Sequence, residues 1–119
     1  MKALGLRTVK YSAPELDKAK AWYADLFQIQ PYFDEPFYVG FNIGGYELGL
    51  DPDGSPEGNS TVTYWGVENI EEAYKDCIAK GAKEDQAPMN VGGELMVASV
   101  KDPWGNVIGL IYNPYFELP

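Results

Sequence analysis

Residues 61–81 read TVTYWGVENIEEAYKDCIAKG, and the fold can be predicted from this stretch outward. Its first seven residues are β-branched, aromatic or small, which is typical of a strand. Asn69 followed by Glu72 has the spacing of a helix N-cap, and Gly81 has the place of a helix end. Between these limits the apolar side chains recur at the 3.6-residue period of a helix, at Ile70, Ala73, Tyr74, Cys77 and Ile78. The stretch therefore predicts a strand followed by an amphipathic helix.

The first half of the chain carries the same pattern. A shift of 54 residues places Thr8 on Val62 and Leu16 on Ile70. Ser12 and Glu15 have the spacing of a capping box for the first helix. Its apolar positions are Leu16, Ala19, Tyr23, Leu26 and Phe27. The two halves thus predict one unit that occurs twice.

Three further strands follow each predicted helix. Residues 37–43 and 94–100 have the clearest strand composition, and Gly44-Gly45 and Gly105-Asn106 have the composition of tight hairpin turns. We therefore expect an α+β fold: two tandem βαβββ modules that form a curved mixed sheet around a cleft.

The expected boundaries follow from a polar stretch in the middle of the chain. Residues 53–60 contain only turn-forming and polar residues and predict a linker. Residues 1–52 are then the first module and residues 61–119 the second, within a single domain of 1–119.

Composition excludes several classes of function. The 119 residues include 18 Asp and Glu against 9 Lys and Arg, one Cys and no His, for a formal net charge of −9. Such a charge disfavours nucleic acids and anionic membranes as partners. The absence of His excludes His-dependent catalytic triads and Cys/His zinc sites. No long apolar run and no signal-peptide pattern are present, so we expect a cytoplasmic protein.

The most specific motif is Asp102-Pro103-Trp104-Gly105-Asn106-Val107-Ile108. It resembles the Asp-Pro-x-Gly-Asn signature before the last strand of the vicinal oxygen chelate superfamily, which includes glyoxalase I, extradiol dioxygenases and bleomycin-resistance proteins. The stretch from Thr8 to Leu26 resembles the opening of the same family. The resemblance covers essentially the whole chain and implies the glyoxalase-like fold expected above.

The resemblance also implies four positions for metal ligands, one on each of four strands. They fall on Thr8, Glu47, Val62 and Gly109, where the family's metal enzymes commonly carry His, Glu, His and Glu. A divalent metal needs several N, O or S donors, and Val and Gly side chains supply none. We therefore expect no metal and no cofactor. Lys10, on the same strand face as Thr8, is a candidate ion-pair partner for Glu47.

Strand alternation sorts side chains into a pocket face and a helix face. The helix face is expected to hold Val9, Tyr11, Trp65, Val67, Ile108 and Leu110. Gly49 and Gly109 lack side chains on the pocket face, which is expected to leave room there. The predicted ligand-binding residues are Thr8, Lys10, Tyr38, Phe41, Glu47, Tyr64, Trp104, Gly109 and Ile111.

Two functions are the main candidates, and a third, a purely structural or partner-binding module, stays open beside them. The first is a binding protein that holds a small hydrophobic or aromatic molecule in an aromatic-lined cleft, as the bleomycin-resistance branch does; aromatic residues make up 14% of the chain. The second is a metal-independent isomerase or lyase with Glu47 as general base. A buried Glu47 without a cationic partner would favour catalysis, and an exposed or Lys-paired one would favour binding. The resemblance implies a homodimer in either case.

Overall fold

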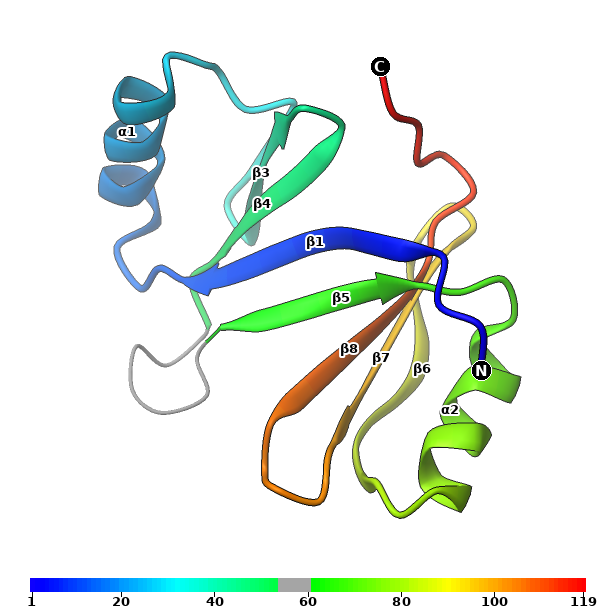
Figure 1. Ribbon diagram of the computed structural model, residues 1–119. Helices are drawn as coiled ribbons and strands as arrows, with labels where there is room; N and C mark the ends of the chain where they lie inside the picture. The colour runs from blue at the N-terminus through cyan, green and yellow to red at the C-terminus, as the bar shows by residue number, and fades with distance from the viewer. Residues whose placement is uncertain (54–60) are drawn as a thin grey trace. The chain divides into compact units, whose positions relative to one another are not determined.

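The computed structural model describes residues 1–53 and 61–119, and its helices and strands are shown in Figure 1. The chain divides into two compact units. The first unit comprises residues 8–62 and 118–119, and the second comprises residues 1–7 and 63–117. The linker expected at residues 53–60 lies almost wholly outside the described residues.

The first unit is built from four strands and one helix. Strand β1 (Gly5–Ser12), whose first three residues belong to the second unit, is followed by α1 (Leu16–Phe27), β2 (Phe33–Glu35), β3 (Tyr38–Ile43) and β4 (Tyr46–Asp51). The strands lie in the order β2-β3-β4-β1. Strands β1 and β4 are parallel, and the other two pairs are antiparallel. Gly44 and Gly45 both have positive φ and form the expected two-residue turn between β3 and β4.

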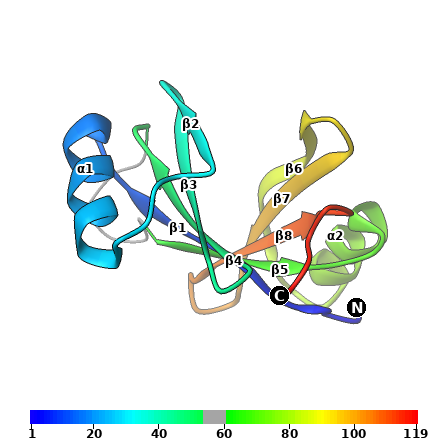
Figure 2. The same ribbon diagram turned by 90° about the horizontal axis from the view of Figure 1, so that it is seen from above.

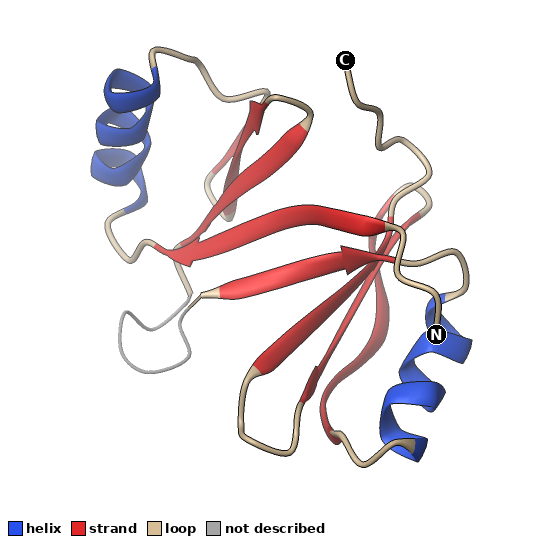
Figure 3. Ribbon diagram, in the orientation of Figure 1, coloured by secondary structure: helices blue, strands red, loops and turns tan. Residues whose placement is uncertain are grey.

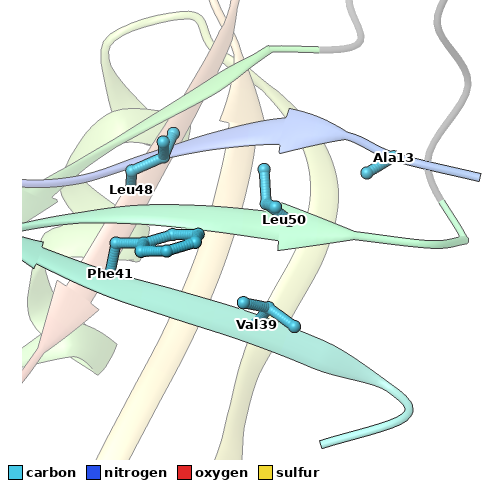
Figure 4. Close-up of a cluster of buried hydrophobic side chains, with 5 residues drawn as sticks. All are labelled: Ala13, Val39, Phe41, Leu48 and Leu50. Atoms are coloured by element: carbon cyan, nitrogen blue, oxygen red, sulfur yellow. The ribbon is translucent and has the colours of Figure 1, made fainter. Parts of the chain in front are cut away.

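The core of this unit lies between the sheet and α1. Alternate residues of β3 and β4 point toward the helix, and Phe41 and Leu50 are fully buried there. Figure 4 shows the cluster, which consists of Ala13, Val39, Phe41, Leu48 and Leu50. Helix α1 packs on it through Leu16, Ala19, Tyr23 and Ala24. Thr8, Tyr38 and Glu47, which sit one residue out of phase with the core positions, therefore belong to the opposite face of the sheet.

The second unit repeats this arrangement. It contains β5 (Val62–Gly66), whose first residue belongs to the first unit, then α2 (Ile70–Ala79), β6 (Lys83–Gly92), β7 (Leu95–Lys101) and β8 (Val107–Tyr112). The strands lie in the order β5-β8-β7-β6, and α2 packs against β6, β7 and β8 (Figures 2 and 3). Its buried cluster consists of Val67, Ile70, Ala73, Ala98 and Leu110.

Backbone register confirms the internal repeat. The N–H of Ala13 donates to the carbonyl of Asp51 at 2.8 Å, and the N–H of Val67 donates to the carbonyl of Ile111 at 2.9 Å. Ala13 and Val67 are 54 residues apart, which is the shift that superposes the two openings in the sequence. Asp51 and Ile111 are 60 residues apart, so the second unit contains six more residues before its last strand.

The α+β class, the mixed sheet pairing and the repeated βαβββ order are confirmed. The helix limits of the second unit are also as expected, since the Asn69 side chain accepts a hydrogen bond from the N–H of Glu72 at 3.1 Å. The capping box expected in the first unit is wrong. Ser12 is the last residue of β1, its hydroxyl is buried without a partner, and Glu15 caps α1 with no side-chain bond. Within the described residues no helix is long and apolar enough to cross a membrane.

The signature loop is wider than the expected two-residue turn. Between β7 and β8 the carboxylate of Asp102 accepts hydrogen bonds from the N–H groups of Trp104 and Asn106 at 2.9 and 2.8 Å and from the Asn106 side chain at 2.8 Å. The bond from the Asn106 side chain is the main cause that lowers the pKa of Asp102 below its ordinary value. Gly105 has φ +92°, which an L side chain rarely adopts. The signature of residues 102–106 is thus a self-capped turn.

Candidate functional site

Glu47 lies on the sheet face opposite α1, in the middle of the first unit. Its register partner on β1 is Thr8, and its register partner on β3 is Asn42. Residues in register share a face, so Thr8 and Glu47 point the same way. Glu47 is half-buried and Thr8 is buried, with 6% of its surface exposed. A half-buried carboxylate needs hydrogen-bond donors to replace the water that it loses.

Three hydroxyl groups supply those donors. The Thr8 hydroxyl donates to Glu47 Oε1 at 3.2 Å, and the Tyr38 hydroxyl donates to the same oxygen at 2.6 Å. The Tyr32 hydroxyl donates to Oε2. We call these four residues, Thr8, Tyr32, Tyr38 and Glu47, the Glu47 cluster. An ionised carboxylate only accepts hydrogen bonds, so three O–H donors match its charged form.

Two glycines make the space that this cluster fills. A Cβ atom on Gly49 would lie 1.7 Å from the Tyr38 hydroxyl oxygen, and a Cβ atom on Gly40 would lie 2.7 Å from Glu47 Oε2. Both distances are far below ordinary van der Waals contact. The room expected at Gly49 therefore exists, but the Tyr38 ring occupies it. The same holds at Gly109 in the second unit, where a Cβ would lie 2.5 Å from the ring of Tyr64.

The hydroxyl of Tyr32 is held in its protonated form. Desolvation raises its pKa well above the usual value of 10.0, and the hydrogen bond to Glu47 and the negative charge of Glu47 raise it further. The side chain as a whole remains 62% exposed. The exposed fraction is that of the whole residue, and within it the hydroxyl group donates to Glu47. Tyr32 therefore acts as a hydrogen-bond donor throughout the physiological pH range.

The expected pairing of Lys10 with Glu47 is not found. Lys10 Nζ forms an ion pair with Asp51 at 3.3 Å, and both side chains are about three-quarters buried, with 23% and 24% exposed. Within the described part of the chain the salt bridges do not include Glu47. Lys10 lies in register with Gly49 rather than with Glu47, and Asp51 is two residues further along β4. The Lys10 ammonium group thus lies with Asp51 and not with Glu47.

The structure separates the predicted ligand-binding residues into three groups. Thr8, Tyr38 and Glu47 come together, with Lys10 on the same face. Phe41 does not join them, because it is a core residue under α1 with no exposed surface; it is adjacent in sequence to the sheet-face position Gly40, and alternation turns it the other way. The remaining four residues lie in the second unit, at Tyr64, Trp104, Gly109 and Ile111.

In the second unit, three of the four predicted ligand-binding residues lie on one face of the sheet. Tyr64 pairs in register with Gly109, and Gly66 pairs with Ile111, so Tyr64, Gly109 and Ile111 share the face opposite α2. Tyr64 and Ile111 are buried, with 8% and 6% exposed. Trp104 lies in the signature loop between β7 and β8, so it is not part of this sheet face, and it is 83% exposed.

The donor set at the four family positions does not fit a metal ion. Thr8 already donates its hydroxyl to Glu47, and Val62 and Gly109 have no donor. The repeat register adds that Gly109 corresponds to Gly49, while Glu47 corresponds to Val107, so neither assignment of the last position supplies a ligand. Among the residues that the structure describes, no group of three or more His, Cys, Asp or Glu is placed to hold a metal.

Sequence reasoning missed part of the site. Tyr32 lies between Pro31 and the short strand β2, where no periodic pattern marks a face, so only its neighbourhood of aromatic residues could have indicated it. Phe33 packs edge-on against Tyr38 and Phe37, with ring centroids 6.1 and 6.0 Å apart. We call Tyr32, Phe33, Phe37 and Tyr38 the aromatic group. It joins the Glu47 cluster through its two tyrosines.

A separate groove of about 640 Å³ lies elsewhere in the first unit. Its only charged side chains are Lys20, Asp25 and Asp34, and Lys20 is neutralised by an ion pair with Asp34 at 3.2 Å. It contains no residue of the Glu47 cluster or the aromatic group. The remaining lining residues are Ala21, Ala24, Gln28, Ile29 and Gln30. The volume of the groove does not by itself indicate a ligand or a reaction. The Glu47 cluster, with its hydrogen-bonded carboxylate, is therefore the stronger candidate site.

Comparison with known proteins agrees with this fold. Residues 5–110 match the family model described as the Glyoxalase/Bleomycin resistance protein/Dioxygenase superfamily. A comparison with curated proteins gives no match.

Several solved structures are similar. A Streptomyces coelicolor methylmalonyl-CoA epimerase variant in complex with 2-nitronate-propionyl-CoA has a TM-score of 0.78 and 12% identity, covering 99% of this chain and 100% of that one. A superfamily member from Vibrio splendidus 12B01 has a TM-score of 0.67 and 16% identity, with coverages of 90% and 97%. The Mn(II)-bound glyoxalase from Novosphingobium aromaticivorans has a TM-score of 0.70 and 17% identity, with coverages of 93% and 39%. At these identities the likeness shows the fold alone.

The fit between Gly49 and Tyr38 can be tested by a double-mutant cycle. Gly49→Ala should lower the free energy of unfolding by about 1–3 kcal/mol, because the new methyl group overlaps the Tyr38 ring. In a Tyr38→Ala background the same change should cost less than about 0.5 kcal/mol. Urea denaturation measures both. In the matched control, a Trp22→Ala background, the full cost of Gly49→Ala should persist; an equal cost in all three backgrounds would contradict the contact.

The raised pKa of Tyr32 predicts a pH dependence of stability. Because its pKa is higher in the folded chain than the ordinary 10.0, its contribution is fully present below about pH 10 and is lost as the pH rises toward the folded value. The difference in unfolding free energy between wild type and Tyr32→Phe should therefore be constant near neutral pH and shrink above about pH 10. Thr8→Val is the control, since a threonine hydroxyl does not titrate there. If the difference between the unfolding free energies of wild type and Tyr32→Phe grew with pH, the raised pKa of Tyr32 would be contradicted.

Proposed function

Because the chain belongs to the Glyoxalase/Bleomycin resistance protein/Dioxygenase superfamily, we propose that it is a binding protein of that superfamily. It holds a small hydrophobic or aromatic molecule against the aromatic group of its first unit, without the metal ion that the family's metal enzymes use. The site comprises the Glu47 cluster together with Phe33 and Phe37.

The contacts of Glu47 carry this proposal. A metal ligand must direct a lone pair at the ion, and a general base must direct one at the substrate proton. Glu47 has about four acceptor positions on its two oxygens, and three of them are taken by the hydroxyls of Thr8, Tyr32 and Tyr38. The carboxylate is thus built into the surface as a fixed polar element, and the aromatic side chains beside it provide the contact surface for a ligand.

The aromatic group supports the same function through its exposure. Tyr32 is 62% exposed, Phe33 39% and Phe37 64%, and these residues lie close together in the sequence, just before β2, in β2 and just before β3. Single exposed apolar side chains are ordinary on a protein surface, but a contiguous set marks a contact surface. Flat aromatic faces suit planar ligands, because stacked or edge-on rings gain energy beyond the buried area.

One observation favours the enzyme as a second candidate. Glu47 is half-buried and, among the described residues, has no salt-bridge partner, which is the environment expected of a general base. The acceptor position that the three hydroxyls leave would have to receive the proton of the substrate. Such an isomerase or lyase would exchange a substrate proton with solvent deuterium, and Glu47→Gln would abolish that exchange. A binding protein would catalyse no exchange.

The homodimer and the cytoplasmic location stay predictions. Three apolar side chains near the end of the chain are well exposed and are candidates for a dimer contact: Trp104 at 83%, Tyr115 at 64% and Leu118 at 51%. Exposed aromatic and aliphatic side chains are common at such contacts.

Binding at the aromatic group can be tested with a panel of water-soluble aromatic compounds. A compound that binds the folded chain stabilises it by mass action. At a concentration one hundred times Kd, the free energy of unfolding rises by about 2.7 kcal/mol, and the midpoint of thermal unfolding rises with it. Tyr32→Ala should weaken the binding of every hit by about tenfold, because it removes one exposed ring and one polar contact. Trp22→Ala removes another exposed ring of the same unit, on α1, and should leave binding unchanged.

Two results would contradict this function. In the first, no compound shifts the unfolding midpoint while deuterium exchange into a carbonyl or thioester substrate is observed, which would favour the enzyme. In the second, hits are found but Trp22→Ala weakens them and Tyr32→Ala does not, which would place the site on the helix side.

A further inference from the structure

The Glu47 cluster contains a negative charge that the described part of the chain does not pair with a cation. Its three partners are hydroxyls, which solvate the carboxylate but leave its charge in place. Lys10, the basic residue on the same face, is bound to Asp51. Glu35 adds a second carboxylate to this face, since it lies in register with Tyr38. The local charge therefore stays negative around the aromatic group.

The hydrogen bonds also change the two tyrosine rings. Each ring donates its hydroxyl proton to an anion, which shifts electron density from oxygen into the ring. A more electron-rich ring presents a more negative face, and that face attracts cations. One edge of the Tyr32 ring lies near Gly40, with its Cε1 3.2 Å from where a Cβ would stand, and 62% of the residue's surface is exposed to solvent. Phe33 and Phe37 extend this surface beyond the tyrosines.

These features fit one class of ligand better than others. A cation on an aromatic or hydrophobic body would gain both the field of Glu47 and contact with the ring faces. A neutral molecule of the same shape would gain only the ring contacts. An anion would be repelled by Glu47 and Glu35, and by the formal net charge of −9 of the whole chain.

We propose that the ligand of this site is an organic cation, in which an ammonium or guanidinium group is carried on an aromatic or hydrophobic body. The positive group lies on the tyrosine faces next to Glu47, and the hydrophobic body lies on Phe33 and Phe37. This inference rests on the proposed binding function, and it adds that charge decides which hydrophobic molecules are bound.

Three probes with one ring system test the role of charge. They are naphthylmethyl-trimethylammonium, which is cationic, naphthalenemethanol, which is neutral, and naphthaleneacetate, which is anionic. Titration of the folded chain by NMR gives Kd for each probe. The cation should bind about tenfold more tightly than the neutral probe, and the anion more weakly than either. Adding salt should weaken the binding of the cationic probe and leave the binding of the neutral probe nearly unchanged.

Two charge variants locate the effect. Glu47→Gln keeps the size and an acceptor oxygen but removes the charge, and should abolish the tenfold preference for the cation while the neutral probe still binds. Glu71→Gln removes one charge from the exposed start of α2 and should keep the preference. Circular dichroism and the unfolding midpoint establish that each variant is folded; if Glu47→Gln does not fold, Tyr32→Phe, which removes the hydroxyl that polarises one ring, should reduce the preference instead.

The outcomes separate this inference from the function on which it rests. If the cation and the neutral probe bind equally, or if Glu71→Gln removes the preference as Glu47→Gln does, the inference is wrong and the binding function stands. If none of the three probes binds and the wider aromatic panel gives no hit, the binding function fails and the inference fails with it.

Discussion

The need to solvate one half-buried carboxylate organises the face on which the proposed function depends. Removing an ionised group from water costs several kcal/mol unless hydrogen bonds replace the lost solvent. The first unit meets this need with three hydroxyls from three different segments: Thr8 on β1, Tyr38 on β3 and Tyr32 before β2. Each hydroxyl must reach Glu47 from its own place, so the carboxylate ties these segments to β4.

Glycine and tyrosine make that arrangement possible together. At Gly40 and Gly49 the sheet has no side chains on this face, and the freed space holds the carboxylate and the Tyr38 ring. The second unit uses the same device, since the ring of Tyr64 lies over Gly109, the repeat counterpart of Gly49. The two units differ at one position of this face, because the second unit has Val107 where the first has Glu47. Only the first unit therefore has a carboxylate at this position for tyrosine and threonine hydroxyls to surround.

The sequence predicted the fold well because hydrophobic periodicity is a local property. The two helices, the repeated βαβββ order and the side-chain alternation that puts Leu110 under a helix all follow from spacing along the chain. The site was harder to predict, because side-chain reach is not local. Lys10 and Glu47 lie on the same face of the sheet. Lys10 is in register with Gly49, midway between Glu47 and Asp51, and it forms its ion pair with Asp51. Phe41 was misplaced among ligand-binding residues although it is core, and Tyr32 lies outside any periodic segment.

We propose that hydroxyl groups of the chain, in place of a metal ion, complete the surroundings of Glu47. The most direct test is isothermal titration with Mn²⁺, Ni²⁺ and Zn²⁺, together with a crystal grown in Mn²⁺ and examined for anomalous scattering at Glu47. We expect no tight stoichiometric binding, no anomalous peak, and hydroxyl oxygens of Thr8, Tyr32 and Tyr38 at hydrogen-bond distance from the carboxylate. A one-to-one metal complex that Glu47→Ala abolishes, with an anomalous peak about 2.0–2.2 Å from a Glu47 oxygen, would contradict it.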